Sequence, residues 1–210
     1  MSKRFTEDDF GITHLASMFH QDWRGRGSAS DVVASYVAQT SLPYAFALAE
    51  DALRLEEAGD DGEVEVLWAC ATGSYHRLDV DGITGLDWVR VIVDQCNLRL
   101  LEVGSPALRA VGRSPYGELS AEVVAEIDAI EADLIEAIDR ESWASIPGFV
   151  RELRKCATAV CPELAFRVLL RVLMEYSCPI GRVQYERFVN LGGDFSYGEF
   201  VVSRIEFLVS

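Results

Sequence analysis

Apolar residues recur at intervals of three and four along most of this 210-residue chain, and this spacing limits the fold more than any other feature. Such intervals place side chains on one face of an α-helix, whereas a half-buried strand alternates at every second residue. Ile12, Leu15 and Phe19 follow the helical pattern, and the segment from Trp88 to Leu101 is apolar on more than one face. An element of the latter kind usually lies at the centre of its domain. We therefore predict an all-α protein.

Two pairs of residues have the spacing of a capping box, in which a hydroxyl and a carboxylate three residues later cap the start of a helix. Ser28 precedes Asp31 in this way, and Thr84 precedes Asp87. We expect a helix to begin at each pair.

The second half of the chain also has helical spacing, with one ambiguous segment. One long helix is predicted from Leu119 to Asp139, and a shorter helix is expected to end at Gly192-Gly193. The tail from Tyr197 to Val209 fits either a helix or a strand. Ser196 with Glu199 has capping-box spacing, which favours a helix there.

Turn-forming residues cluster between Gly104 and Gly117, where Gly, Pro and Ser recur within a short span. Such clusters mark loops and domain boundaries. We therefore predict a helical domain over residues 1–103, a linker over 104–117 and a second helical domain over 118–210. A single extended helical array is the alternative architecture.

The charge of the chain restricts its partners. The 34 acidic and 19 basic residues give a formal net charge of −15. A protein of this charge repels nucleic acid and anionic membrane surfaces, and it attracts basic partners. No uncharged apolar run approaches the length that spans a membrane. We expect a basic protein partner, no nucleic acid and no membrane.

The N-terminal residues and the cysteines indicate the compartment. No apolar stretch follows the basic residues near the N-terminus, so no signal peptide is expected. The five cysteines are an odd number and are widely scattered, mostly among apolar residues, where a free thiol behaves as a small buried hydrophobe. We therefore expect a reducing, cytoplasmic location.

Two small groups of residues could form a catalytic or metal-binding site, but each lacks the further side chains that such a site needs. His20 and Asp22 could form a catalytic or metal-binding dyad, but His14 is six residues from His20 and lies off a shared helix face. Three cysteines of the second half have poor spacing for zinc and no fourth ligand nearby: Cys156, Cys161 and Cys178. We predict no catalytic residue, no cofactor site and no metal site. A hydrolase built on His20 and Asp22 is the distant alternative.

The stretch from Phe19 to Trp23 is predicted to fix how the first helix meets its neighbours. Phe19 and Trp23 are four residues apart, so both rings should lie on one helix face, buried against the helix that carries Trp88. Asp22 would face the negative end of the helix dipole. This placement is tolerable if its carboxylate bonds to a backbone N–H or pairs with a following arginine.

The same stretch, Phe19-His20-Gln21-Asp22-Trp23, resembles the hallmark of a family of immunity proteins from contact-dependent growth inhibition systems. A second region resembles the closing segment of that family, a Gly-x-Tyr loop leading into a Trp-bearing helix. It consists of Gly73-Ser74-Tyr75, Asp81-Gly82 and Asp87-Trp88-Val89. The order and the spacing of the two regions agree with the family, and the resemblance covers roughly residues 8–102.

The resemblance implies a small, mostly helical cytoplasmic protein that binds and blocks a toxin domain delivered by sibling cells. The family supplies no catalytic residue. Its hallmark residues are expected to act as a structural anchor: Phe19, Asp22, Trp23, Tyr75 and Trp88. Residues 105–210 exceed one such domain, and we expect them to form a second immunity-type domain or an accessory one.

Two acidic surfaces are candidates for binding a basic toxin, such as a nuclease whose active site holds phosphate. The first is a stripe on the predicted long helix: Glu122, Glu126, Asp133 and Glu136. The second lies at the acidic end of an earlier helix and in the break that follows it: Glu56, Glu57, Asp60 and Asp61. Each could instead be an ordinary solvated face. We favour the stripe, because a regular helix would hold four carboxylates in one row.

A non-enzymatic helical adaptor that binds another basic protein is the alternative function. The acidic charge of the chain and its lack of a catalytic constellation fit this function equally well. Protection against a toxin encoded beside this chain would distinguish the two functions.

Overall fold

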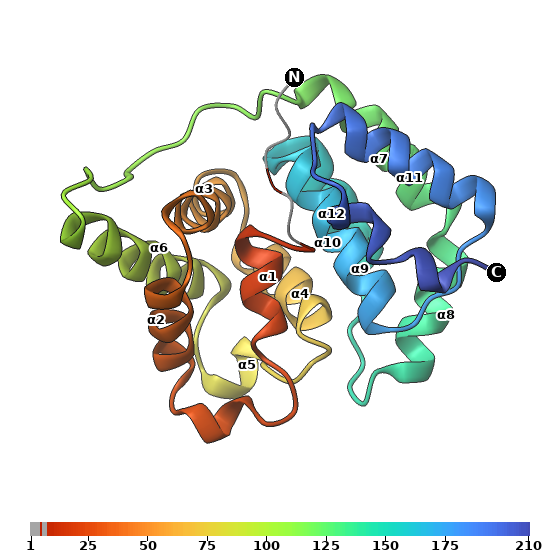
Figure 1. Ribbon diagram of the computed structural model, residues 1–210. Coiled ribbons are helices and arrows are strands. Elements are labelled where there is room, and N and C mark those ends of the chain that lie inside the picture. Colours follow the sequence, from red (N-terminus) through yellow and green to blue (C-terminus); the bar gives the residue numbers. More distant parts are fainter. Residues whose placement is uncertain (1–4, 6–7) are drawn as a thin grey trace. The chain divides into compact units, whose positions relative to one another are not determined.

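The computed structural model describes residue 5 and residues 8–210, and within this range the chain is all-α (Figure 1). These residues form twelve α-helices and no strand, which confirms the predicted fold class. One isolated bridge joins Ile180 to Val209. No helix within the described range is both long and apolar enough to cross a bilayer.

The chain divides into two compact units. The N-terminal unit is Phe10–Arg113, and the C-terminal unit is Ser114–Ser210 together with the described residues that precede Phe10, namely Phe5, Asp8 and Asp9. The division after Arg113 falls inside the range predicted as a linker. The grouping of the first residues with the C-terminal unit was not part of the domain prediction. Its local basis is an ion pair between Asp9 Oδ2 and Arg204 Nη1, 2.5 Å apart and buried on both sides.

Helix α6 forms the centre of the N-terminal unit, as the apolar pattern predicted, and it packs against α2, α3 and α4. Its buried residues include Trp88, Ile92, Cys96 and Leu100 at helical spacing. The helices of this unit are α1 (Gly11–Ser17), α2 (Ala29–Gln39), α3 (Leu42–Ala58), α4 (Asp61–Ala71), α5 (Leu78–Asp81) and α6 (Gly85–Glu102), with the 3-10 helix η1 (Trp23–Arg26) between α1 and α2.

Both predicted helix starts in this unit are confirmed. The Ser28 hydroxyl accepts a hydrogen bond from the Asp31 backbone N–H, and the Asp31 carboxylate accepts one from the Ser28 N–H. At α6 the Thr84 hydroxyl accepts from the Asp87 N–H. Each cap satisfies backbone donors that have no partner inside the helix.

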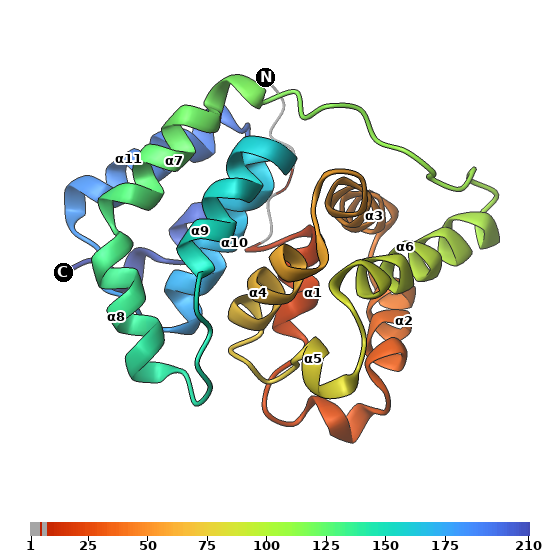
Figure 2. The ribbon, with the colours of Figure 1, turned by 180° about the vertical axis from the view of Figure 1, so that it is seen from behind.

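In the C-terminal unit, α7, α9 and the π-helical segment η3 pack against α10, seen from behind in Figure 2. Every residue of α10 from Pro162 to Leu173 is buried. The helices are α7 (Ser120–Ala129), α8 (Glu131–Glu141), α9 (Phe149–Lys155), α10 (Pro162–Glu175), α11 (Arg182–Asp194) and α12 (Phe200–Ser203), with η2 (Gly117–Leu119), η3 (Cys156–Val160) and η4 (Glu206–Leu208) as short non-α turns.

The prediction of one long helix from Leu119 to Asp139 is wrong. Ile130 leaves the helical conformation, with φ −121° and ψ 10°, so α7 and α8 are separate helices. Arg154 stabilises the break, because its guanidinium lies 2.7 Å from Asp128 and 2.6 Å from Glu131, one carboxylate on each side.

The expected structure near the C-terminus also differs. Gly192 and Gly193 lie inside α11 and do not end it. Ser196 takes a left-handed conformation, with φ 59°, so it cannot start a capping box. Only a short helix, α12, follows, and Glu199 is its N-terminal flanking residue. The tail therefore contains two short helical turns, α12 and η4, and one bridging residue, Val209, where a continuous helix was predicted.

Candidate functional site

The two stretches that carry the family resemblance meet in one aromatic cluster of the N-terminal unit. The expectation that Phe19 and Trp23 share a helix face is wrong, because α1 ends at Ser17 and Trp23 opens η1. The chain turns between them and still brings the rings together, with centroids 5.1 Å apart in an edge-to-face arrangement. Both side chains are buried, as predicted.

Five rings form this cluster, and each is almost fully buried: Phe19, Trp23, Trp68, His76 and Trp88. Phe19 lies at the centre, with its ring 4.6 Å from His76, 5.2 Å from Trp68 and 5.8 Å from Trp88. The contact with Trp88 confirms that Phe19 packs against α6. Rings of this size bury large apolar areas, and their offset and edge-to-face geometries add specific attraction.

Two indole N–H groups are satisfied inside the cluster. Trp23 Nε1 donates to the backbone carbonyl of Tyr75 at 2.8 Å, and Trp68 Nε1 donates to His76 Nδ1 at 3.0 Å. The Tyr75 side chain itself is 38% exposed. Tyr75 therefore supports the cluster through its main chain, whereas the sequence suggested an anchoring side chain.

His76 is the polar member of the cluster. Because Nδ1 accepts from Trp68, the pattern of hydrogen bonds leaves the imidazole proton on Nε2, which lies 3.2 Å from Asp81 Oδ2. Burial lowers the pKa of His76 to about 4, against the opposing effect of the Asp81 carboxylate. The imidazole is therefore neutral at neutral pH, with Nδ1 facing Trp68 and Nε2 facing Asp81.

Arg24 lies over the Trp23 ring of the cluster and beside Asp81. Its guanidinium lies 3.0 Å from Asp81 Oδ1 and 4.4 Å from the centre of the Trp23 ring. Asp81 therefore joins the exposed Arg24 to the buried His76. This chain of contacts was not predicted from the sequence. The sequence contains one indication of it: Trp68, His76 and Asp81 lie close together along the chain, on either side of and within one loop.

Asp22 does not act as the predicted anchor. Its side chain is exposed and makes no capping hydrogen bond to η1. Arg24, one of the two following arginines that could have paired with it, pairs with Asp81 instead. Its main link to the neighbouring histidine is through its backbone N–H, which donates to His20 Nδ1 at 3.3 Å. That geometry differs from a carboxylate orienting a catalytic imidazole.

The acids at the end of α3 and the start of α4 are engaged inside the N-terminal unit. Glu56 pairs with Arg90 at 2.9 Å, and Glu57 accepts from the Val111 N–H at 3.2 Å. Asp60 caps α4 by accepting from the Glu63 N–H, and Asp61 accepts from the Leu86 N–H at 2.8 Å. Each of the four carboxylates therefore has a role in the unit's own structure.

The predicted acidic stripe is divided between α7 and α8. Glu126 is half-buried and binds Arg187 and Gln184 of α11, with 2.8 Å to the arginine. Glu122, Asp133 and Glu136 are exposed, and none of them hydrogen-bonds to a described residue. Three of the four carboxylates are thus available to a partner, but they do not form the single row on one helix that was expected.

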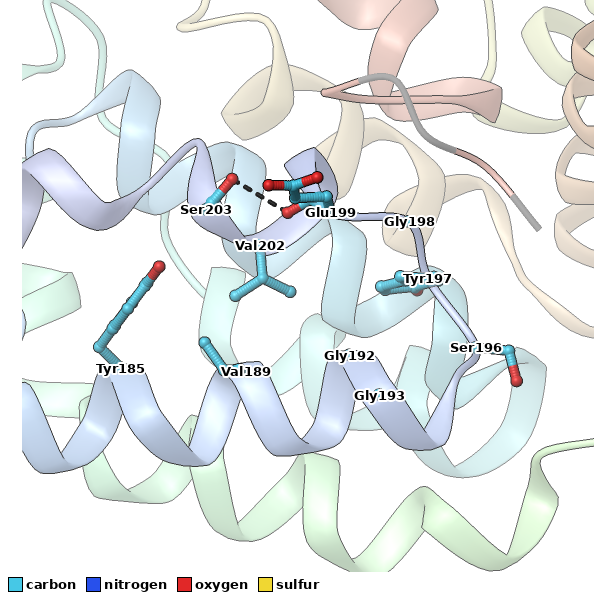
Figure 3. Close-up of a pocket in the computed structure, with 10 residues that line it drawn as sticks. All are labelled: Tyr185, Val189, Gly192, Gly193, Ser196, Tyr197, Gly198, Glu199, Val202 and Ser203. Carbon is cyan, nitrogen blue, oxygen red and sulfur yellow. Dashed lines mark hydrogen bonds between the residues drawn. The ribbon is translucent and has the colours of Figure 1, made fainter. Parts of the chain in front are cut away.

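Open pockets formed by described residues of the C-terminal unit include two that border α11 and α8. One is bounded by α11 and the segment that ends in α12, with a volume of about 550 Å³ (Figure 3). The other lies between α8, α9 and their connecting loop, with a volume of about 390 Å³. Trp143, in that loop, is 66% exposed.

All five cysteines are buried. Burial raises the pKa of Cys96 to about 12 and that of Cys178 to about 11, so neither is an activated nucleophile. Within the described part of the chain, no group of three or more His, Cys, Asp and Glu residues could hold a metal ion.

Comparison of the chain with protein-family models, with curated proteins and with solved structures finds no match.

Proposed function

We propose that this chain is a cytoplasmic immunity protein that binds and neutralises a cognate toxin domain, without catalysis and without a cofactor. One observation supports the proposal above the others. The two stretches that resemble the immunity family pack into one core, in which Trp23 donates a hydrogen bond to Tyr75 and Phe19 contacts Trp88. A coincidental resemblance would not require the two stretches to meet.

The charge of the chain supports a basic partner. The net charge is −15, and Glu122, Asp133 and Glu136 are exposed acids free of internal hydrogen bonds within the described residues. A nuclease toxin fits these features, because its active site must attract phosphate. Complementary charge accelerates association with such a partner and disfavours unrelated ones.

Co-expression with the toxin domain encoded by the neighbouring gene tests the proposal. We expect cells to survive toxin expression only when this chain is present, and we expect the two proteins to co-purify. Co-purification without protection would favour the adaptor function. Absence of both a complex and protection would refute the immunity function.

A further inference from the structure

The pocket beside α11 has the composition of a docking groove, which we call the α11–α12 groove. Its walls are α11 on one side and the segment Ser196–Ser203 on the other (Figure 3). Val202 and Tyr197 of the second wall pack on α11 and are buried, at 6% and 3% exposure, whereas Val189 of α11 is 44% exposed. The apolar surface that the groove offers to a partner is therefore mainly that of Val189, one turn before Gly193.

The two glycines of α11 shape this groove differently. A Cβ on Gly192 would lie 2.5 Å from Val202 Cγ2, so Gly192 permits the close packing of the two walls. A Cβ on Gly193 would meet no atom within 4 Å. Gly193 therefore leaves open space in the groove, and a side chain from another molecule can approach the helix backbone there.

Polar groups at the groove define what it can bind. The Tyr185 hydroxyl points toward the α12 side in Figure 3, and it makes no hydrogen bond to another described residue. Burial, together with Glu206, raises the pKa of Tyr185, so the hydroxyl remains a neutral donor and acceptor. Glu199 lines the groove with an exposed side chain. The carboxylate can accept hydrogen bonds from a cationic group.

The local charge is negative because the nearby bases are already engaged. Arg187 pairs with Glu126, and Arg204 pairs with Asp9. Arg182 lies over the Tyr185 ring, 5.9 Å from its centre. The acids between residues 182 and 210 are Glu186, Asp194, Glu199 and Glu206.

We propose that the α11–α12 groove docks a segment of the toxin domain that carries an apolar side chain next to a lysine or arginine. The apolar side chain fills the space above Gly193, and the cation pairs with Glu199. Well-packed anchors surrounded by complementary charge are the features that dominate protein interfaces. This inference rests on the proposed immunity function and names the surface through which it acts.

A thiol introduced into the groove tests its occupancy directly. The five native cysteines are buried, so Gly193→Cys supplies an accessible thiol in the full chain. We expect the toxin domain to slow alkylation of this thiol at least tenfold. Gly117→Cys is the matched control, because Gly117 is also exposed, lies in the same unit and has open space around it. Its alkylation rate should not change.

Two further variants measure affinity and charge. Gly193→Leu fills the groove and should raise the Kd for the toxin domain at least tenfold, whereas Gly117→Leu should not. Glu199→Lys should slow association and weaken its salt dependence, whereas the exposed Asp94→Lys, with the same change in net charge, should do so less.

The outcomes separate the two proposals. A complex with the toxin domain in which the Gly193→Cys thiol stays fully reactive, and in which Gly193→Leu binds normally, would overturn the groove assignment and leave the immunity function standing. A wild-type chain that forms no complex with the toxin domain would overturn the immunity function itself.

Discussion

The indole N–H of Trp23 donates to the backbone carbonyl of Tyr75, 2.8 Å away and 52 positions along the chain. This bond joins the loop after α1 to the loop after α4, and it satisfies a polar group that would otherwise be buried without a partner. Such groups strongly disfavour the folded state when they are left unpaired. The bond therefore fixes the two loops around the aromatic cluster.

Trp23→Ala should lower the free energy of unfolding by about 3–5 kcal/mol, because it removes a large buried ring from the cluster. Trp23→Phe keeps most of the apolar contact but leaves the Tyr75 carbonyl unpaired, so we expect a smaller loss of about 1–3 kcal/mol. Urea titrations followed by circular dichroism measure both values. A Trp23→Ala variant that unfolds at the same urea concentration as the wild type would contradict the anchoring role.

His76 should make the protein less stable in mild acid. Its pKa in the folded state is about 4, below the ordinary value of 6.5, so the unfolded chain binds this proton more readily. Stability therefore falls as the pH drops from about 6.5 to about 4, by roughly 3 kcal/mol from this group alone, and no such loss occurs above that window.

His76→Gln provides the control, since glutamine cannot titrate. The variant should have lower stability at pH 7 but a flatter dependence between pH 6.5 and 4. Denaturation midpoints across that range measure the difference. Parallel curves for the wild type and the variant would show that His76 is not buried in its neutral form.

Trypsin should cut first after Arg113 and more slowly after Arg109. Two hydrogen bonds from the Asn97 side chain hold the Leu108 backbone, and Glu57 accepts from Val111, so this part of the connection is fixed to the N-terminal unit. Residues 112–114 have no helical structure and follow the last of these bonds. Mass spectrometry of timed digests identifies the first site, and initial cleavage after Arg109 would be the contrary result.

After that cut the two fragments should remain associated. The fragment that ends at Arg113 still carries Asp9, whose carboxylate pairs with Arg204 on the other fragment. Asp9→Ala leaves a buried arginine without its carboxylate, a change that typically destabilises a protein by about 3–5 kcal/mol. Size-exclusion chromatography should show co-elution for the cut wild type and separation for the cut variant.

Reversing the charge of Glu122, Asp133 and Glu136 to lysine should leave the melting temperature almost unchanged, because all three are exposed. If these acids attract a basic toxin, association should slow and its salt dependence should weaken. Glu126→Lys is a contrasting variant that should lower the melting temperature, since Glu126 holds Arg187. Unchanged association after the triple reversal would mean that these acids serve solubility alone.

Local signals in this sequence predict local structure well. The Ser28–Asp31 cap forms because both partners lie within one turn. The break at Ile130 could not be predicted in this way, because the apolar pattern continues through it. Arg154, which holds the break, lies 23 residues after Glu131.

The candidate site shows the same limit. The burial of Phe19 and Trp23 followed from their size, but the part played by His76 depends on rings supplied by three other segments. A single histidine in a turn has no periodic pattern that indicates burial. Asp22 and Tyr75 were named from their place in a motif, and the structure gives an anchoring contact to the Tyr75 main chain alone.

The placement of the residues up to Asp9 in the C-terminal unit has a consequence for synthesis. In the sequence, the N-terminal unit is inserted into the C-terminal unit. The chain leaves the C-terminal unit after Asp9 and returns to it at Ser114. On the ribosome, the inserted unit has all its residues once Arg113 has emerged. The C-terminal unit cannot form its Asp9–Arg204 ion pair until Arg204 has also emerged. Domains generally fold as units as they emerge, so we expect the aromatic cluster to form first and the Asp9–Arg204 pair to form last.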